Sequence, residues 1–144
     1  APVTRIDLAT GPVPVYTVQV STPSLGDHSY LVAAGDRAVV IDPQRDIARF
    51  ETAAADAGVE VRFVLETHLH NDYVSGGRSA AQATGGQLVL PASSGAAFDY
   101  LPAFHLEDLD GGSFTVRPIH TPGHTPEHVS YLVLVDDEQV FLGQ

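Results

Sequence analysis

Two histidines and an aspartate lie within five residues of this 144-residue chain, at His68, His70 and Asp72. They come directly after residues 61–65, an apolar run typical of a β-strand. In extended backbone alternate side chains point to the same side, so these three groups can converge while Leu69 packs behind them. Neutral imidazole is the commonest protein ligand for zinc and also suits iron. The spacing therefore predicts a metal-binding loop, and the alternative is a solvated polar loop.

A second group of histidines occupies residues 120–128, between two predicted strands. Two prolines and one glycine restrict the backbone of this segment. A metal site needs its ligands held in place before the ion binds, and rigid turns at strand ends provide this. We expect His124 to be the third metal ligand. His120 and His128 each have two equally good interpretations. One is a residue that supports the ligands or contacts substrate, and the other is an ordinary surface histidine.

The composition excludes several classes of function. The formal net charge is -11, from 18 acidic and 7 basic residues, and all the basic residues are arginine. Nucleic acid and anionic membranes would be repelled by this charge. Cysteine is absent, so a metal must be held by histidine, carboxylate or water. No run is apolar enough for a membrane span, and residues 1–7 lack a signal-peptide pattern, which favours a soluble, cytoplasmic protein. His28 and His105 have no supporting neighbours in the sequence, and we expect a structural role for each.

The elements that position these residues belong to one α/β domain. Apolar alternation predicts strands, and apolar residues at helical spacing before Gly58 predict a helix. The expected strands are 13–20, 29–34, 37–42, 59–65, 87–90, 104–107, 114–119, 129–135 and 139–142, with turns at 35–36 and 136–137. The expected helices are 46–57, 75–84 and a short one at 95–100. The histidine loop then follows the carboxyl end of a strand, where open α/β folds bind ligands.

The motifs resemble those of a known superfamily. The pattern T-H-x-H-x-D at residues 67–72, followed by Ser75-Gly76 and by T-P-G-H-T at residues 121–125, is similar to that of the metallo-β-lactamase superfamily. Residues 71–76 and 123–131 are most similar to the persulfide dioxygenases and their rhodanese-linked relatives, with the glyoxalase II hydrolases as cousins. The resemblance implies an αβ/βα sandwich with the metal in a groove along one edge of two sheets. It also implies that Asp42, at the end of an early strand, supports the metal loop.

The chain departs from the superfamily pattern at three places. Tyr73 stands where a histidine usually binds the second metal, and Gln144 stands where an aspartate usually binds or bridges the metals. The superfamily fold also continues for a further half. The resemblance therefore implies that residues 1–144 form the first half to two-thirds of a metallo-β-lactamase-like domain. We expect a second segment or chain to complete it, because a sheet face without covering helices would expose a large apolar patch.

The resemblance implies one divalent metal ion, zinc or iron, held by His68, His70 and His124. Such a three-histidine site with an open position lowers the pKa of water on zinc to near 7. Asp72 would accept a proton, and Tyr73 would fill the volume of the second metal. The expected protein is a mononuclear enzyme, persulfide dioxygenase-like, acting on a small thiol-derived substrate, alone or as a homo-oligomer. The alternatives are a glyoxalase II-type zinc thioester hydrolase and a degenerate binding domain without metal.

Overall fold

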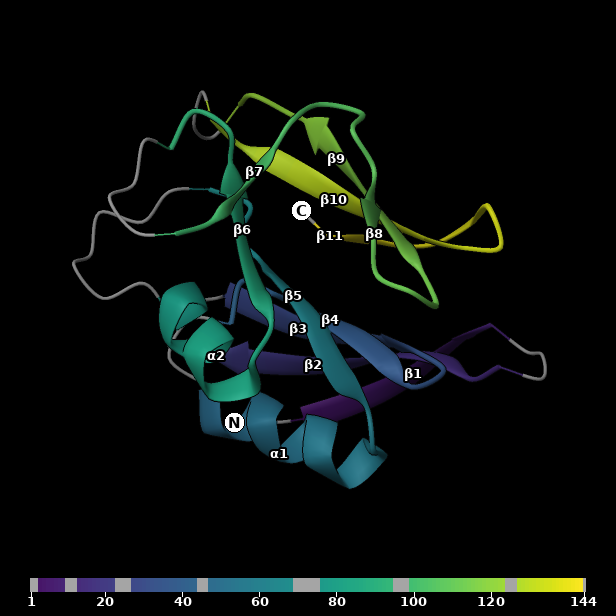
Figure 1. Ribbon diagram of the computed structural model, residues 1–144. Coiled ribbons are helices and arrows are strands. Elements are labelled where there is room, and N and C mark those ends of the chain that lie inside the picture. The colour runs from purple at the N-terminus through teal and green to yellow at the C-terminus, as the bar shows by residue number, and fades with distance from the viewer. Residues whose placement is uncertain are drawn as a thin grey trace.

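The computed structural model describes residues 3–9, 13–22, 27–43, 47–68, 76–94, 99–123 and 127–143, and within these ranges the chain forms two β-sheets and two helices (Figure 1). The seven-stranded sheet contains β1 (Val3–Ala9), β2 (Val15–Thr22), β3 (Asp27–Ala34), β4 (Arg37–Ile41), β5 (Glu60–Leu65), β6 (Gln87–Pro91) and β7 (Leu101–Ala103). The four-stranded sheet contains β8 (Leu109–Asp110), β9 (Thr115–His120), β10 (Val129–Val135) and β11 (Glu138–Gly143). The helices are α1 (Ile47–Ala57) and α2 (Gly76–Thr84).

The seven-stranded sheet is antiparallel on one side and parallel on the other. Its strand order is β1-β2-β3-β4-β5-β6-β7, with antiparallel pairs up to β4 and parallel pairs from β4 to β7. The hairpin between β3 and β4 turns at Gly35, whose φ of 63° is accessible to glycine at no steric cost. The two helices make the crossovers that parallel strands require, α1 before β5 and α2 before β6. The carboxyl ends of β4, β5 and β6 therefore meet at one edge of the sheet.

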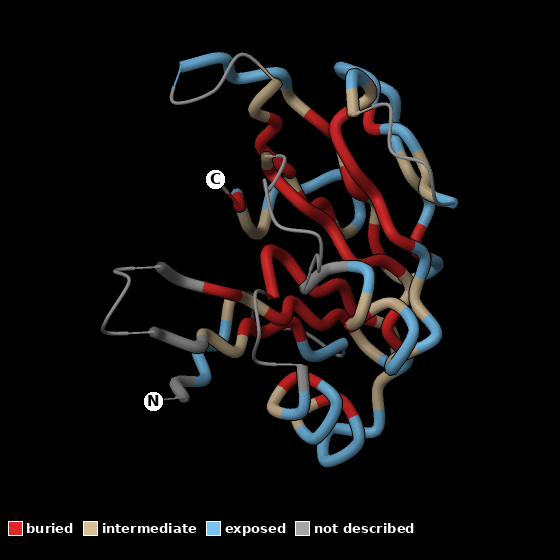
Figure 2. Tube along the Cα trace, turned by 90° about the vertical axis from the view of Figure 1, so that its left-hand side faces the viewer, coloured by how far each residue is buried: buried red, intermediate tan, exposed pale blue. Residues whose placement is uncertain are grey.

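The two sheets pack face to face around one apolar core. This core joins residues of both sheets, among them Ile41, Leu65 and Val89 from the first and Val116 and Tyr131 from the second. All five are buried, and Figure 2 shows the buried trace running through the facing strands of both sheets. The site residues at the strand ends are therefore held by a close-packed interior on both sides.

A second apolar core lies between the seven-stranded sheet and the helices. It contains Phe50 and Ala54 of α1 and Ala80 of α2, packed on strand residues such as Val40. Strand β4 is buried on both faces, which explains its unbroken apolar run after Arg37. Among the described residues, no helix covers the outer face of the four-stranded sheet (Figure 1). The described layers are thus helix, sheet and sheet, in agreement with the expected αβ/βα sandwich.

Most expected elements are present, with boundaries displaced by one or two residues. The strand expected at 104–107 is wrong, because these residues form a turn in which Leu106 has a φ of 62°, and the neighbouring strand is β7. Strands β1, β7 and β8 were not expected. Of the helix expected at 95–100, residues 95–98 lie outside the described residues, and residues 99–100 are not helical.

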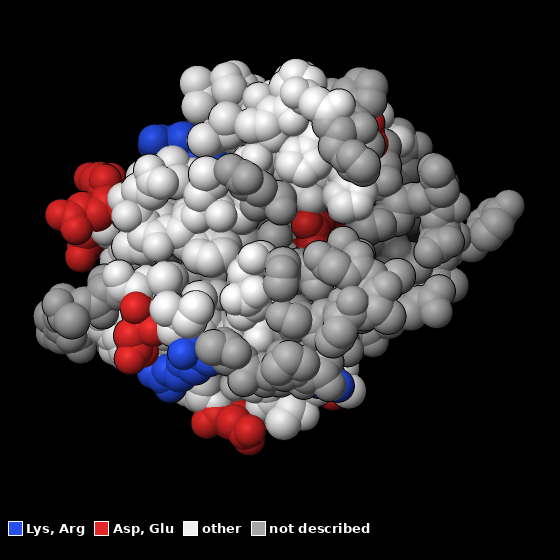
Figure 3. All heavy atoms as spheres, turned by 180° about the vertical axis from the view of Figure 1, so that it is seen from behind, with Lys and Arg blue, Asp and Glu red and all other residues white. Residues whose placement is uncertain are grey.

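Two surface properties bear on partners. No described helix has the length and apolar character that crossing a lipid bilayer requires. On the face shown in Figure 3, acidic side chains and arginines lie in small separate groups, and the described part of that face has no extended basic patch.

Candidate metal centre

His68 lies at the edge where the parallel strands end. It follows β5, which ends at Leu65, and Asp42 follows the neighbouring strand β4. Two backbone hydrogen bonds continue the sheet past the strand ends: Asp42 N donates to Leu65 O at 2.9 Å, and Glu66 N donates to Val89 O at 3.0 Å. The segment that carries His68 is therefore fixed by both of its neighbouring strands.

Asp42 is buried and holds the start of the histidine loop. Its side chain accepts two hydrogen bonds from Thr67, at 2.9 Å from the backbone nitrogen to Oδ1 and at 2.6 Å from the hydroxyl to Oδ2. Asp42 is 8% exposed and Thr67 is 1% exposed. The backbone of Asp42 is left-handed, with a φ of 46°, a conformation that aspartate tolerates better than most residues. The Ser29 hydroxyl donates to its carbonyl oxygen.

These contacts decide which nitrogen of His68 carries hydrogen. The Thr67 hydroxyl has one hydrogen, and a carboxylate such as Asp42 only accepts, so this hydrogen goes to Asp42. His68 Nδ1 lies 3.0 Å from the same hydroxyl oxygen, which can then only accept from it. His68 therefore carries hydrogen on Nδ1 and keeps a lone pair on Nε2. A supporting hydrogen bond of this kind is what metal-binding histidines ordinarily have.

His128 faces His68 from the other sheet. Their rings are nearly parallel, at 9° between planes, with centroids 6.1 Å apart. His128 Nδ1 lies 2.9 Å from the Thr121 hydroxyl, which also lies 2.8 Å from the Ser130 hydroxyl. The backbone adds a third contact, because Thr121 N donates to His128 O at 2.9 Å. This polar cluster fixes the two ends of the 120–128 segment relative to each other.

Hydrogen bonds also join the two sheets directly beside His68. Val129 N donates to Thr67 O at 2.7 Å, and the Tyr131 hydroxyl donates to Glu66 O at 2.7 Å. Burial raises the pKa of Tyr131 well above its usual range, and the negative charges of Asp42 and Glu66 raise it further. The phenol therefore stays protonated and remains a donor at neutral pH.

His120 has a different environment from His128. Its side chain is exposed, and its backbone nitrogen donates to His105 Nδ1 at 3.0 Å. His105, for which we expected a structural role, thus ties the turn after β7 to the end of β9. Leu106 N reinforces this connection by donating to Pro118 O at 2.8 Å.

Several predicted site residues lie outside the described residues, namely His70, Asp72, Tyr73, His124 and Gln144. Within the described ranges, no three potential ligand side chains come together as a metal-sized group. The described side chains fit a metal in one respect, because Nδ1 of His68 makes the supporting hydrogen bond that metal-binding histidines ordinarily have.

Sequence reasoning missed four residues of this region, Thr67, Thr121, Ser130 and Tyr131. Thr67 directly precedes the first histidine, and a hydroxyl beside a candidate ligand is a signal that sequence alone offers. The contacts of Ser130 and Tyr131 depend on how the strands pack, so no local pattern indicates them.

Comparison with known proteins agrees with this fold and site. The family model described as "Metallo-beta-lactamase superfamily" matches residues 25–137. A hydroxyacylglutathione hydrolase from Acidiphilium cryptum is 36% identical over 113 residues, covering 76% of this chain and 46% of the relative. Among solved structures, a metallo-beta-lactamase from Staphylococcus aureus superposes with a TM-score of 0.71 at 29% identity, covering 83% of this chain and 38% of that one. ETHE1 from Myxococcus xanthus gives 0.70 at 25% identity, covering 80% and 52%.

The chain belongs to the metallo-beta-lactamase superfamily. Within it, relatives of both the glyoxalase II and the ETHE1 kind resemble the chain, in agreement with the branch that the motifs indicate. The chain spans less than half the length of this hydroxyacylglutathione hydrolase and about half of this ETHE1 structure.

Proposed function

We propose that this chain carries the metal site of a mononuclear enzyme that hydrolyses a small thioester. The observation that carries the proposal is the chain of contacts from Asp42 through Thr67 to His68, which holds the imidazole by Nδ1 at the carboxyl ends of the parallel strands, as metal-binding histidines ordinarily are held. The reaction class is supported by relatives such as the hydroxyacylglutathione hydrolases, which are up to 36% identical to this chain.

In this proposal His68, His70 and His124 hold one divalent ion, zinc or iron. The ion, when bound, supplies Lewis-acid activation of water near neutral pH. Asp72 would accept a proton from the reacting water, because a carboxylate is a suitable proton acceptor. Asp42 and Thr67 keep His68 in the tautomer that binds metal. His120, His128, Tyr73 and Gln144 are assigned to supporting the ligands or contacting substrate.

The test is metal-dependent hydrolysis of a hydroxyacylglutathione by the protein loaded with zinc. We expect hydrolysis to disappear in His68→Gln, whereas His105→Gln, which changes a histidine tied to β9, retains it. Metal content measured by mass spectrometry should fall from about one ion per chain to none in His68→Gln alone. Thioester cleavage that persists in His68→Gln would refute the proposal.

A second candidate is a persulfide dioxygenase-like activity, favoured by the TM-score of 0.70 with ETHE1 and by the motif resemblance. Iron-loaded protein would then consume oxygen in the presence of a glutathione persulfide. If neither activity appears and no ion binds, the chain is a degenerate binding domain.

We further propose that another segment or chain completes the fold, and that the substrate is a small thiol derivative. The outer face of the four-stranded sheet supports this, because Leu142 on β11 is 39% exposed and Leu132, its register partner on β10, is half-buried. No described helix covers these side chains. Mass measurement of the native assembly would detect such a partner or a homo-oligomer.

A further inference from the structure

Strand β1 forms one edge of the seven-stranded sheet. It pairs with β2 on one side, and no described strand pairs with its other side (Figure 1). Arg5, Ile6 and Asp7, in the middle of β1, are all exposed. In an antiparallel pair only alternate residues direct their backbone N–H and C=O groups to the partner strand, so the others direct theirs away from β2. A free edge of this kind is a template for pairing with another strand.

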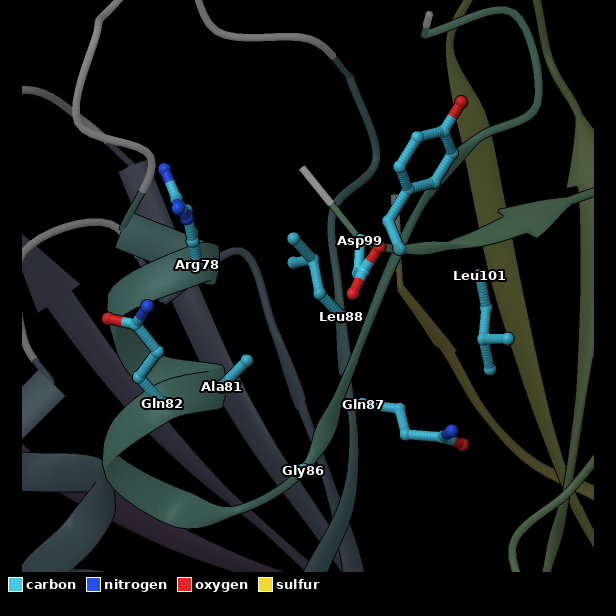
Figure 4. Close-up of a pocket in the computed structure, with 9 residues that line it drawn as sticks. Arg78, Ala81, Gln82, Gly86, Gln87, Leu88, Asp99 and Leu101 are labelled. Carbon is cyan, nitrogen blue, oxygen red and sulfur yellow. The ribbon is translucent and has the colours of Figure 1, made fainter. Parts of the chain in front are cut away.

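The opposite edge of the sheet offers no comparable template. Strand β7 has only three residues, and Pro102 in its middle has no backbone N–H. Asp99 and Leu101, at the start of this edge, line a pocket beside α2 (Figure 4). Short edge strands with proline are a common protection against pairing. The described part of the seven-stranded sheet can therefore be extended at β1.

The exposed side chains of β1 carry opposite charges two residues apart. Arg5 and Asp7 lie on the same face of the strand, with side chains 58% and 75% exposed. Arg5 Nε lies 3.4 Å from Asp7 Oδ1, and the guanidinium carbon lies 3.8 Å from the centre of the Tyr16 ring. The contact with Asp7 engages one of the five N–H donors of the guanidinium, which has the capacity to bind a second carboxylate. Ile6, on the opposite face, is 45% exposed.

This pattern fits a second copy of the same chain. Only outward-facing residues can exchange hydrogen bonds across a new contact, so the two-fold axis of an antiparallel pair of β1 strands must pass beside one residue. An axis at Arg5 would place two guanidinium groups opposite each other, and an axis at Asp7 would do the same with two carboxylates. An axis at Ile6 instead places Arg5 of each copy opposite Asp7 of the other, with Cβ atoms about 4.5–5.5 Å apart. We propose that β1 joins two copies of this chain in an antiparallel pair centred on Ile6.

Backbone hydrogen bonds hold this pair together, and the charges select its register. Exposed ion pairs contribute little on their own, whereas like charges directly opposite each other are destabilising. The net charge of -11 on each copy also opposes association. Because the contact is short, we expect a weak dimer, with a Kd on the order of 100 µM.

Charge reversal on β1 tests the proposal. Sedimentation velocity over a range of protein concentrations, up to about ten times this Kd, measures dimerisation. Asp7→Arg places guanidinium groups opposite each other, and Arg5→Asp places carboxylates opposite each other, so each variant should dimerise about tenfold more weakly than the wild type. An equimolar mixture of the two variants should form heterodimers, because each variant then meets the opposite charge at both positions. The double variant Arg5→Asp/Asp7→Arg should dimerise like the wild type.

The controls separate this register from the effects of net charge and folding. Asp56→Arg makes the same charge change on α1, at an exposed position, and should not weaken dimerisation. Asp7→Arg makes the net charge less negative, so long-range repulsion alone would predict a stronger dimer, the opposite result. Circular dichroism checks that the variants fold. In the wild type, alternate backbone amides of β1 should exchange hydrogen more slowly at high protein concentration.

Three outcomes would overturn the proposal. The first is a wild type that stays monomeric over the whole concentration range. The second is single variants that dimerise as strongly as the wild type, which would place the contact elsewhere, for example on the outer face of the four-stranded sheet. The third is a mixture of the two single variants that forms no heterodimer.

Discussion

The Thr67 hydroxyl is the group whose removal tests the site most directly. Thr67→Val keeps the shape of the side chain but deletes the hydroxyl that lies between Asp42 Oδ2 and His68 Nδ1. Asp42 is buried, at 8% exposed, so water cannot easily replace the lost partner. Thr67→Ser is the matched control, because it keeps the hydroxyl and loses only a methyl group.

The expected magnitude follows from the contacts. A hydrogen bond to a charged group contributes about 1.5–3 kcal/mol, and the Thr67 hydroxyl makes one to Asp42. The backbone hydrogen bond from Thr67 to Asp42 remains in the variant. We therefore expect Thr67→Val to lower the free energy of unfolding by about 2–3 kcal/mol, and Thr67→Ser to lower it by about 1 kcal/mol.

Urea unfolding of the metal-free protein measures this difference. With a typical slope of about 1–3 kcal/mol per molar urea, the valine variant should lose about 1 M in its midpoint. Nitrogen chemical shifts of the His68 ring should report hydrogen on Nδ1 in the wild type and a mixture of tautomers in Thr67→Val. Zinc affinity should fall about 10–100-fold. Equal midpoints for the two variants, or an unchanged His68 tautomer, would refute the reasoning.

Three further predictions concern other parts of the molecule. The pKa of Tyr131 is raised in the folded state, so the protonated phenol contributes fully to the free energy of unfolding below about pH 10. Above that pH the free energy of unfolding falls by up to about 1.4 kcal/mol per pH unit. Tyr131→Phe should show a shallower loss between pH 10 and 12 than the wild type, and an equal slope would contradict this. Gly111→Ala places a Cβ against the buried Phe114 ring and should cost about 1–3 kcal/mol. An added Cβ at Gly123 has no described atom within 4 Å beyond its chain neighbours, so Gly123→Ala should change stability by no more than about 0.5 kcal/mol. Similar melting temperatures for the two glycine variants would exclude the clash. Asp108→Asn breaks an exposed ion pair with Arg117, which lowers the pKa of Asp108, and should cost less than about 1 kcal/mol at pH 7. A loss of several kcal/mol in thermal unfolding would mean that this pair is structural.

Elements with strong periodic patterns could be predicted from the sequence, and the exceptions have identifiable causes. Strand β10 agrees with its prediction at both ends, because its alternating residues face one core. Strand β1 was missed because it is an edge strand with Ile6 45% exposed, so its pattern does not separate a buried face from an exposed one. Strand β7 has three residues, including a proline, and forms only by pairing with β6.

The sequence indicates the histidines of the site by their spacing, and Asp42 by the family resemblance. Their spacing indicates His68 and His128 as candidates, but the nearly parallel arrangement of the two rings depends on the docking of two sheets. The tautomer of His68 likewise requires Asp42, which lies 25 residues from Thr67 in sequence. Local patterns carry no information about such distant pairs.

The hydrogen bonds beside His68 have a consequence for the order of folding. The Tyr131 hydroxyl and the Glu66 carbonyl are 65 residues apart in sequence, so their contact closes a long loop. During synthesis, β4, β5 and His68 leave the ribosome well before β10 exists. The segment that holds His68 therefore reaches its final geometry only after the second sheet has docked, and long-range pairing of this kind is slow. Metal uptake during refolding should thus lag behind formation of the first sheet.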